Sequence, residues 1–281
     1  MSTTQTGLPT CYRHPDRETG LSCSECGRPI CTECMTPAAV GIRCPDHAGS
    51  RRPAIKAPRI VRRTSGGATE ALVTKTLIGL NLLIYVITWE QGAGINSPGG
   101  SLFVKWALYG PAVAHGDWWR LITAAFLHAS VLHIASNMYF LWFSGTFVEQ
   151  YLGRARFLAL YFVSGLAGSA GALLVNPLAV TVGASGAIFG VLGALFVLER
   201  RQHINTGGQV AGLIVINLII TFVFSSFISV GGHVGGLIGG IILMWVLLQY
   251  RRSAVLSVAA AVGLAAISIA LAYARLRNYS S

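Results

Sequence analysis

Residues 182–190 read VGASGAIFG, a short stretch that holds a serine between glycines inside a long apolar run. No charged residue lies between Arg156 and Glu199. A hydroxyl group in such surroundings is costly unless it has a hydrogen-bond partner, although a small residue can also serve packing alone. The role of Ser185 therefore depends on what the chain brings to the same depth.

The composition is that of a membrane protein. Of 281 residues, 53% are hydrophobic and 11% are charged, whereas soluble domains carry about a quarter charged residues. Residues 1–71 hold 10 of the 21 Lys and Arg, and all six cysteines lie between Cys11 and Cys44. The chain thus divides into a small polar head and a large apolar body.

The head contains four pairs of Cys or His, each with two residues between its members. Zn²⁺ prefers four such ligands in a tetrahedron, so eight ligands predict two structural zinc ions. Disulfides are the alternative, but the first ten residues show no signal peptide, and cytosolic thiols stay reduced. The spacing leaves open which pairs share an ion. The eight residues are Cys11, His14, Cys23, Cys26, Cys31, Cys34, Cys44 and His47.

Residues 49–70 carry six Lys or Arg together with prolines and glycines, which predicts a basic flexible linker. Such a segment can lie on anionic lipid headgroups. Nucleic-acid binding is disfavoured because no aromatic residues are interleaved with the charges.

Seven apolar runs follow the linker, most of them near the ~20 residues that a spanning helix needs. Arginine pairs occupy the connections after the second, fourth and sixth runs, and this predicts a cytoplasmic N-terminus and an extracytoplasmic C-terminus in a multi-pass cell-membrane protein. The runs cover residues 71–89, 128–148, 157–175, 184–198, 210–230, 233–250 and 254–273.

The fourth run is short. Its 15 residues give roughly 22 Å of helix against a hydrocarbon core of ~30 Å, so its outer end, with Ser185, should lie in a recessed wet cavity. His233 begins the sixth run, which has the same direction. Glycine rows in both runs allow close helix approach, and we expect Ser185 and His233 to meet as nucleophile and base.

His133 and Asn137 lie four residues apart and therefore on one helical face. With His128 and the backbone N–H of Ser185, they could donate hydrogen bonds to a developing oxyanion, although interhelical bonding is the plain alternative. Asp117 is a conceivable third member of a triad, but nothing places it behind His233. The residues favour a Ser–His dyad.

These features together resemble the rhomboid family of intramembrane serine proteases, from about Thr74 to Tyr250. The resemblance implies a six-helix core with a Ser185/His233 dyad and an oxyanion site of His133, Asn137 and the Ser185 amide, near which His128 matches a frequent polar residue. Phe189 departs from a tyrosine common in bacterial relatives, and we expect its ring still to stack on His233. The motifs are Trp119-Arg120, His133-x3-Asn137, Gly145-x3-Glu149-x3-Gly153, Gly183-x-Ser185-Gly186, and His233 with Gly236 and Gly240.

The head resembles B-box-type zinc fingers, which interleave their ligands. That resemblance implies one ion on Cys11, His14, Cys31 and Cys34 and another on Cys23, Cys26, Cys44 and His47, while sequential pairing stays an alternative.

We therefore expect an all-α polytopic membrane protein with four parts: a zinc module (1–48), the linker (49–70), a rhomboid-like six-helix core (71–252), and an additional transmembrane helix with a tail (253–281). The expected substrates are single-pass membrane proteins, cleaved without a catalytic metal. Trp119 and Arg120, in the first outer loop, would shape substrate approach or anchor that loop at the interface. The alternatives are an inactive adaptor, whose zinc module recruits a cytosolic protein, and a small transporter.

Overall fold

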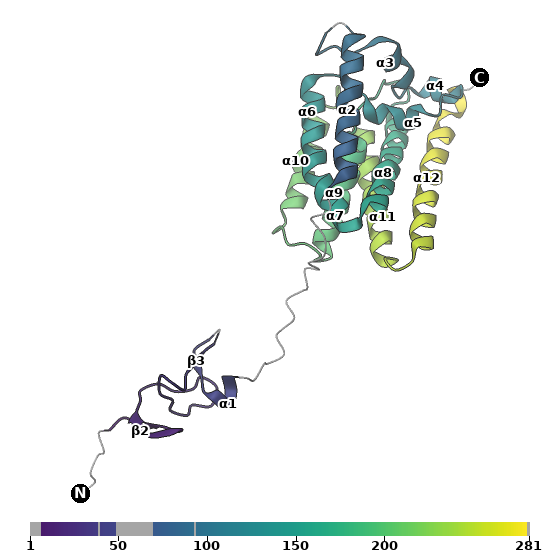
Figure 1. Ribbon diagram of the computed structural model, residues 1–281. Coiled ribbons are helices and arrows are strands. Elements are labelled where there is room, and N and C mark those ends of the chain that lie inside the picture. Colours follow the sequence, from purple (N-terminus) through teal and green to yellow (C-terminus); the bar gives the residue numbers. More distant parts are fainter. Residues whose placement is uncertain (1–6, 39, 49–69, 93, 280–281) are drawn as a thin grey trace. The chain divides into compact units, whose positions relative to one another are not determined.

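The computed structural model describes residues 7–38, 40–48, 70–92 and 94–279, and it divides into two compact units, Met1–Ser65 and Gly66–Ser281 (Figure 1). The predicted linker lies outside the described residues apart from Glu70.

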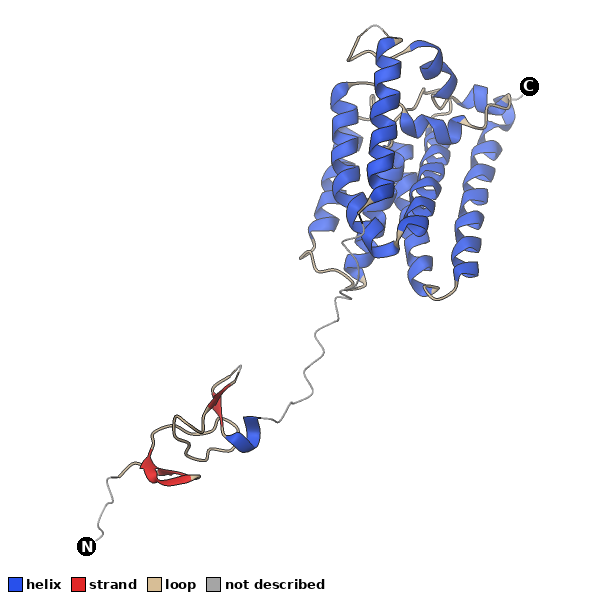
Figure 2. Ribbon diagram, in the orientation of Figure 1, coloured by secondary structure: helices blue, strands red, loops and turns tan. Residues whose placement is uncertain are grey.

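The N-terminal unit has little regular structure (Figure 2). Its strands β1 (Thr10–Cys11) and β2 (His14–Glu18) pair antiparallel, as do β3 (Thr36–Pro37) and β4 (Ile42–Arg43), and helix α1 spans Pro45–Ala48. Its buried core consists of Ile30 and five of the six cysteines. A core of this size cannot hold a fold by apolar burial alone.

Within the described residues, the regular structure of the second unit is helical apart from isolated bridges, and loops connect the helices. The predicted class, a helical membrane domain behind a small cysteine-rich module, is confirmed. The helices are α2 (Leu72–Glu90), α3 (Gly100–Trp106), α4 (Gly110–Ala114), α5 (Arg120–Thr123), η1 (Ala124–Phe126), α6 (Val131–Phe140), η2 (Leu141–Gly145), α7 (Thr146–Leu152), α8 (Arg154–Val175), α9 (Ser185–Arg200), α10 (Gln209–Val223), α11 (Val230–Gln249), α12 (Ala254–Leu276) and η3 (Arg277–Tyr279).

Each of the seven predicted apolar runs contains a helix, but the helices differ in length. Among the described residues, α2, α8, α11 and the α12–η3 segment are long and apolar enough to cross a membrane, and a pair bent by 96°, Arg120–Phe126 with Val131–Leu152, gives a fifth candidate. Helices α9 and α10 have 16 and 15 residues. At 1.5 Å per residue, α9 reaches about 24 Å, less than the ~30 Å hydrocarbon core.

Two predicted boundaries near His233 were wrong. Helix α10 ends at Val223 rather than 230, and α11 begins at Val230 rather than His233. Ser229 accounts for the earlier start, because its side chain accepts a hydrogen bond from the Gly232 N–H at 3.1 Å and caps the helix. His233 therefore lies in the first turn of α11.

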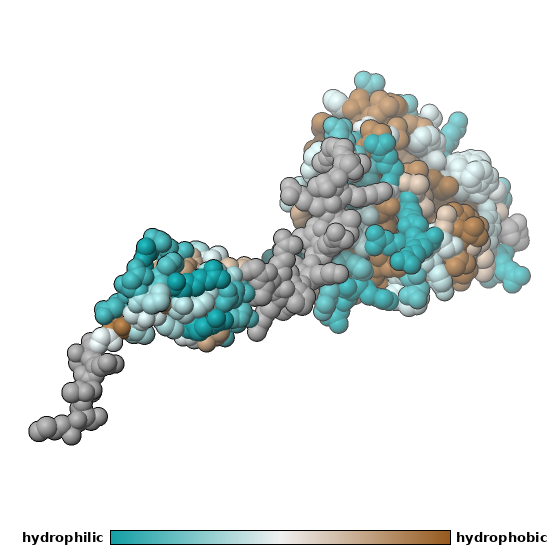
Figure 3. Space-filling model, turned by 60° about the horizontal axis from the view of Figure 1, so that its bottom comes forward, coloured by the Kyte–Doolittle hydropathy of each residue, from teal (hydrophilic) through white to brown (hydrophobic). Residues whose placement is uncertain are grey.

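The apolar surface of the second unit fits a lipid environment. Large hydrophobic side chains are exposed along the outer helices, for example Val258 on α12 and Ile219 on α10. Figure 3 shows brown hydrophobic areas on this unit, whereas the surface of the N-terminal unit is mostly hydrophilic.

The loop between α2 and α6 is held by Arg120, which is 8% exposed. Its guanidinium donates to the carbonyl oxygens of Val104 and Ala107 at 2.6 and 2.8 Å and to the Asp117 carboxylate at 2.9 Å. The Trp119 indole donates to the Lys105 carbonyl at 3.2 Å. Trp119 and Arg120 thus fix α3 and the loop around it.

Glu149 is buried at the start of α2 and caps that helix. Its carboxylate accepts hydrogen bonds from the backbone N–H groups of Val73 and Thr74, at 2.9 and 2.8 Å, and from the Thr74 hydroxyl at 2.8 Å. A Cβ at Gly145 would lie 3.2 Å from the Thr74 side chain. The Gly145-x3-Glu149 motif therefore joins α7 to α2.

Helices α8, α9 and α11 pack together in the unit (Figure 1). They meet at glycines. A Cβ at Gly236 would overlap the Gly186 carbonyl, and a Cβ at Gly240 would overlap the Gly190 backbone. These contacts between backbones, which we call the glycine seam, set the separation of α9 and α11.

Replacing Gly240 by alanine should destabilise the seam, because the added methyl group meets backbone rather than a side chain that can turn away. We expect Gly240→Ala to lower the free energy of unfolding by about 1–3 kcal/mol or more, measured by thermal unfolding in detergent. The matched control is Gly263→Ala on α12, where nothing lies within 4 Å of the new methyl group. Equal unfolding temperatures for both variants would contradict the close contact.

Replacing Glu149 by glutamine should loosen the start of α2, since the amide NH₂ cannot accept from a backbone N–H. We expect Glu149→Gln to cost about 1.5–3 kcal/mol of stability, seen as a lower unfolding temperature. Glu90→Gln, at the exposed other end of α2, is the control and should leave that temperature unchanged.

Candidate active site and metal sites

Ser185 and His233 come from different helices and meet side by side. Ser185 is the first residue of α9, and its Oγ lies 2.7 Å from Nε2 of His233 in the first turn of α11. His233 is 8% exposed, and Ser185 is partly exposed. The glycine seam lets the two helices approach closely enough for this hydrogen bond.

Phe189 lies one turn after Ser185 and stacks on the His233 ring. The two ring centroids are 4.2 Å apart, and the planes differ by 19°. Stacking at this distance limits rotation of the imidazole and keeps water from that face.

Thr221 lies on the side of the His233 ring away from Ser185, and no sequence motif had singled it out. Its Oγ1 is 2.7 Å from His233 Nδ1 and 2.7 Å from the carbonyl oxygen of Asn217. The sequence feature that could have indicated Thr221 is its spacing from Asn217. These two polar residues lie four positions apart and therefore share one face of a largely apolar helix. Asp117, the conceivable third member, instead pairs with Arg120.

The His133 ring lies beside the segment that leads into Ser185. Its Nδ1 accepts a hydrogen bond from the Ala129 N–H at 3.3 Å, so a neutral ring carries its hydrogen on Nε2. A Cβ at Gly183 would be 2.8 Å from His133 Nε2, and Gly183 has a φ of +126°. Space and backbone conformation both require glycine there.

Asn137 and His128 lie near His133 but differ in their contacts. The Asn137 amide donates one hydrogen bond to the His133 carbonyl at 2.8 Å and keeps a second N–H. The His128 ring is 5.0 Å from that of His133, is fully buried, and has no hydrogen-bond partner within the described part of the chain. The contacts thus place the His128 ring beside that of His133.

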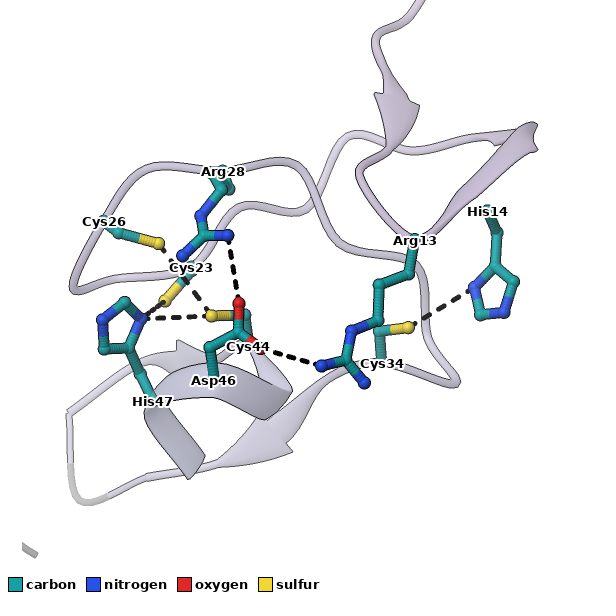
Figure 4. Close-up of polar contacts among 9 residues, drawn as sticks. All are labelled: Arg13, His14, Cys23, Cys26, Arg28, Cys34, Cys44, Asp46 and His47. Atoms are coloured by element: carbon teal, nitrogen blue, oxygen red, sulfur yellow. Dashed lines mark hydrogen bonds and ion pairs between the residues drawn. The ribbon is translucent and has the colours of Figure 1, made fainter. Parts of the chain in front are cut away.

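The eight Cys and His residues of the head form two clusters, in each of which the ligand atoms lie within 4.8 Å of one another. The clusters interleave along the chain. Figure 4 shows Cys23, Cys26, Cys44 and His47 turned toward one another. The members are Cys11, His14, Cys31 and Cys34 in one cluster and Cys23, Cys26, Cys44 and His47 in the other.

The donor set and its spacing fit a tetrahedral metal ion. Zn–S and Zn–N bonds of ~2.3 and ~2.0 Å place neighbouring ligand atoms about 3.5–3.8 Å apart. In the second cluster, His47 Nδ1 lies 3.1 Å from Cys44 Sγ and 3.9 Å from Cys23 Sγ. In the first, His14 Nδ1 lies 3.4 Å from both Cys31 and Cys34 Sγ. All six cysteines are free of disulfides.

Thiol ionisation in the first cluster is uneven. Burial alone would raise the pKa of Cys11, but backbone N–H groups of Cys31 and Arg13 outweigh it and lower that pKa to about 6. Burial and the neighbouring Cys11 and Cys31 sulfurs raise the pKa of Cys34 to about 11. A cation among these sulfurs would relieve the crowding of negative charge.

Asp46 forms ion pairs with residues that lie next to both clusters. Its carboxylate pairs with Arg13 at 2.8 Å and with Arg28 at 3.0 Å (Figure 4). Arg13 precedes His14 of the first cluster, and Asp46 precedes His47 of the second.

Comparison with known proteins identifies the helical unit. Residues 115–250 match the family model of the rhomboid domain. The chain is 37% identical over 165 residues to rhomboid protease GluP of Bacillus subtilis (strain 168), covering 57% of this chain and 32% of GluP. It is 32% identical over 114 residues to rhomboid-like protease 3 of Toxoplasma gondii, covering 41% of this chain and 43% of that protein.

A plant relative shares a shorter segment. RHOMBOID-like protein 1 of Arabidopsis thaliana is 48% identical over 77 residues, which is 27% of this chain and 20% of that protein. The chain thus spans about a third of GluP and less than half of each of the other two relatives. The match of residues 115–250, the protease relatives and the helical unit agree, and the chain contains a rhomboid domain over residues 115–250.

Proposed function

We propose that this protein is a serine protease that cleaves peptide bonds in or near the transmembrane segments of other membrane proteins. Ser185 is the nucleophile and His233 the general base. The observation that carries this proposal is the 2.7 Å hydrogen bond between Ser185 Oγ and His233 Nε2. The names of GluP and the Toxoplasma relative as proteases support it.

The reaction begins when Ser185 Oγ attacks the scissile carbonyl carbon. His233 Nε2 takes the hydroxyl proton as the new C–O bond forms. The tetrahedral intermediate collapses, the C–N bond breaks, and the imidazolium gives its proton to the leaving amine. A water molecule, deprotonated by His233, then attacks the acyl-enzyme, and the proton returns to Ser185 Oγ as the acid product leaves.

The developing oxyanion receives hydrogen bonds from the Ser185 backbone N–H, His133 Nε2–H and the free N–H of Asn137. Support for His133 comes from the Ala129 hydrogen bond, which puts the ring hydrogen on Nε2. His128 acts by packing beside His133. Gly183 and Gly186 keep the entry to α9 clear, because a Cβ at Gly183 would crowd the His133 ring and one at Gly186 would lie 3.2 Å from the Gly232 carbonyl oxygen.

The substrates are single-pass membrane proteins that approach through the bilayer, and the protein has a cytoplasmic N-terminus and an extracytoplasmic C-terminus. The contacts among the basic connections support this orientation. Arg156 donates to the Arg251 carbonyl at 2.8 Å, and the His203 ring lies 5.8 Å from that of Tyr151. The connections after α7, α9 and α11 therefore gather at one end of the unit, which is the cytoplasmic end by the positive-inside rule.

The test of the dyad uses a fluorophosphonate probe on the full chain in membranes, together with cleavage of a model single-pass substrate. Native protein should label and cleave, whereas Ser185→Ala should lose labelling and at least about 1000-fold of the cleavage rate. Ser268→Ala is the matched control, since that buried serine bonds only to the Leu264 carbonyl of its own helix. It should behave as native protein.

Two results would overturn the proposal. Labelling that persists in Ser185→Ala removes Ser185 as the nucleophile. A native protein that neither labels nor cleaves, yet retains a cytosolic partner through its N-terminal unit, is instead an inactive adaptor.

The N-terminal unit is a structural zinc module with two ions. Zinc supplies the fold of this unit, because its core consists mainly of the ligands themselves. Three cysteines and one histidine hold each ion, a donor set that Zn²⁺ favours.

Paired substitutions separate interleaved from sequential sites. Metal analysis of the full chain should find about two zinc ions. Cys11→Ser with Cys31→Ser removes two ligands of one interleaved site and should leave about one ion, whereas Cys11→Ser with Cys23→Ser should leave none. The reverse result would establish sequential pairing, and fewer than one ion in native protein would exclude the zinc module.

A further inference from the structure

Thr221 is a buried polar residue on a lipid-facing helix. Its neighbours on α10, Ile220 and Phe222, are exposed, whereas Thr221 is 1% exposed. Its hydroxyl lies against the imidazole nitrogen that faces away from Ser185. The mechanism above does not use this contact.

The direction of the hydrogen bonds follows from counting hydrogens. The Thr221 hydroxyl has one hydrogen and two partners, the Asn217 carbonyl oxygen and His233 Nδ1, each at 2.7 Å. A carbonyl oxygen can only accept, so the hydroxyl donates to Asn217. His233 must then donate its Nδ1–H to the Thr221 oxygen.

This direction determines the tautomer of His233. A neutral imidazole with its hydrogen on Nδ1 has a lone pair on Nε2, and only that lone pair can accept the Ser185 proton. The opposite tautomer would present an N–H to Ser185 Oγ and could not act as a base. We propose that Thr221 is a positioning residue that holds His233 in the tautomer and orientation needed to activate Ser185. This inference rests on the proposed protease function.

A hydroxyl suits this position better than a carboxylate. His233 is packed against Phe189 of α9 on one ring face and Thr221 of α10 at Nδ1, within a largely buried site. An ionised acid there would be costly to desolvate. Threonine offers an acceptor without charge, and its own bond to the Asn217 carbonyl polarises it when His233 becomes positive.

The experiment compares Thr221→Val with native protein, using the full chain in proteoliposomes and a fluorogenic single-pass transmembrane peptide. Valine keeps the shape and removes the hydroxyl. We expect kcat to fall roughly 10- to 100-fold, as for loss of one hydrogen bond to a charged group, with KM unchanged. The rate of fluorophosphonate labelling should fall in parallel. Thr221→Ser, which keeps the hydroxyl, should recover most of the rate.

Thr88→Val is the matched control, because Thr88 is a buried threonine on α2 that bonds to the carbonyls of Ile84 and Tyr85 within its own helix. It should retain native kcat. All rates are taken per folded molecule, and Thr221→Ala gives a second variant without the hydroxyl.

The outcomes separate the two proposals. If native protein cleaves the peptide and Ser185→Ala does not, the result supports the Ser185–His233 dyad. The role of Thr221 is then overturned if Thr221→Val and Thr221→Ala keep native kcat, or if Thr221→Ser is as slow as Thr221→Val. A change in KM alone would also overturn it. If native protein and Ser185→Ala do not differ, the protease function itself fails.

Discussion

The arrangement around Ser185 depends on the direct contact of two helix backbones. Where a Cβ at Gly236 would overlap the Gly186 carbonyl, no side chain can lie between α9 and α11. The hydroxyl of Ser185 and the ring of His233 are therefore held by the main chain rather than by adjustable side-chain packing. The 2.7 Å hydrogen bond between Ser185 and His233 and the stacking of the Phe189 ring on His233 both follow from that separation.

The two units are stabilised by different physical means. The helical unit gains its stability from backbone approach and from buried polar contacts such as the Glu149 cap on α2. The N-terminal unit has a core made largely of potential ligands, so with the proposed zinc sites its free energy of folding depends on ion binding. Removal of metal should therefore affect one unit and leave the helices of the other intact.

Much of this architecture could be predicted from the sequence, because its signals are strong and local. Apolar runs and arginine pairs indicate a polytopic membrane protein, and glycines at four-residue spacing indicate which helices approach. The resemblance to the rhomboid family, drawn from ordered motifs, was confirmed by the match of residues 115–250. The catalytic roles of Ser185 and His233 stay a prediction.

Other features depend on contacts between distant segments and have no local signal. The short helices of the first loop are held by Arg120 through carbonyls 13 and 16 residues away. The start of α11 depends on the side-chain cap that Ser229 forms. The pattern of hydrophobic residues does not indicate this cap. Thr221 was missed because a threonine in an apolar helix normally bonds only to its own backbone.

The glycine seam also determines where this protein can vary. A centre built from main-chain contacts has no spare volume, so changes of side chain there are penalised whatever their chemistry. Changes of sequence are therefore better tolerated in the outer layer, which consists of the lipid-facing surfaces of α2, α10 and α12. Under the proposed protease function, engineering of substrate preference would begin on that periphery, since it can be rebuilt without moving Ser185 relative to His233.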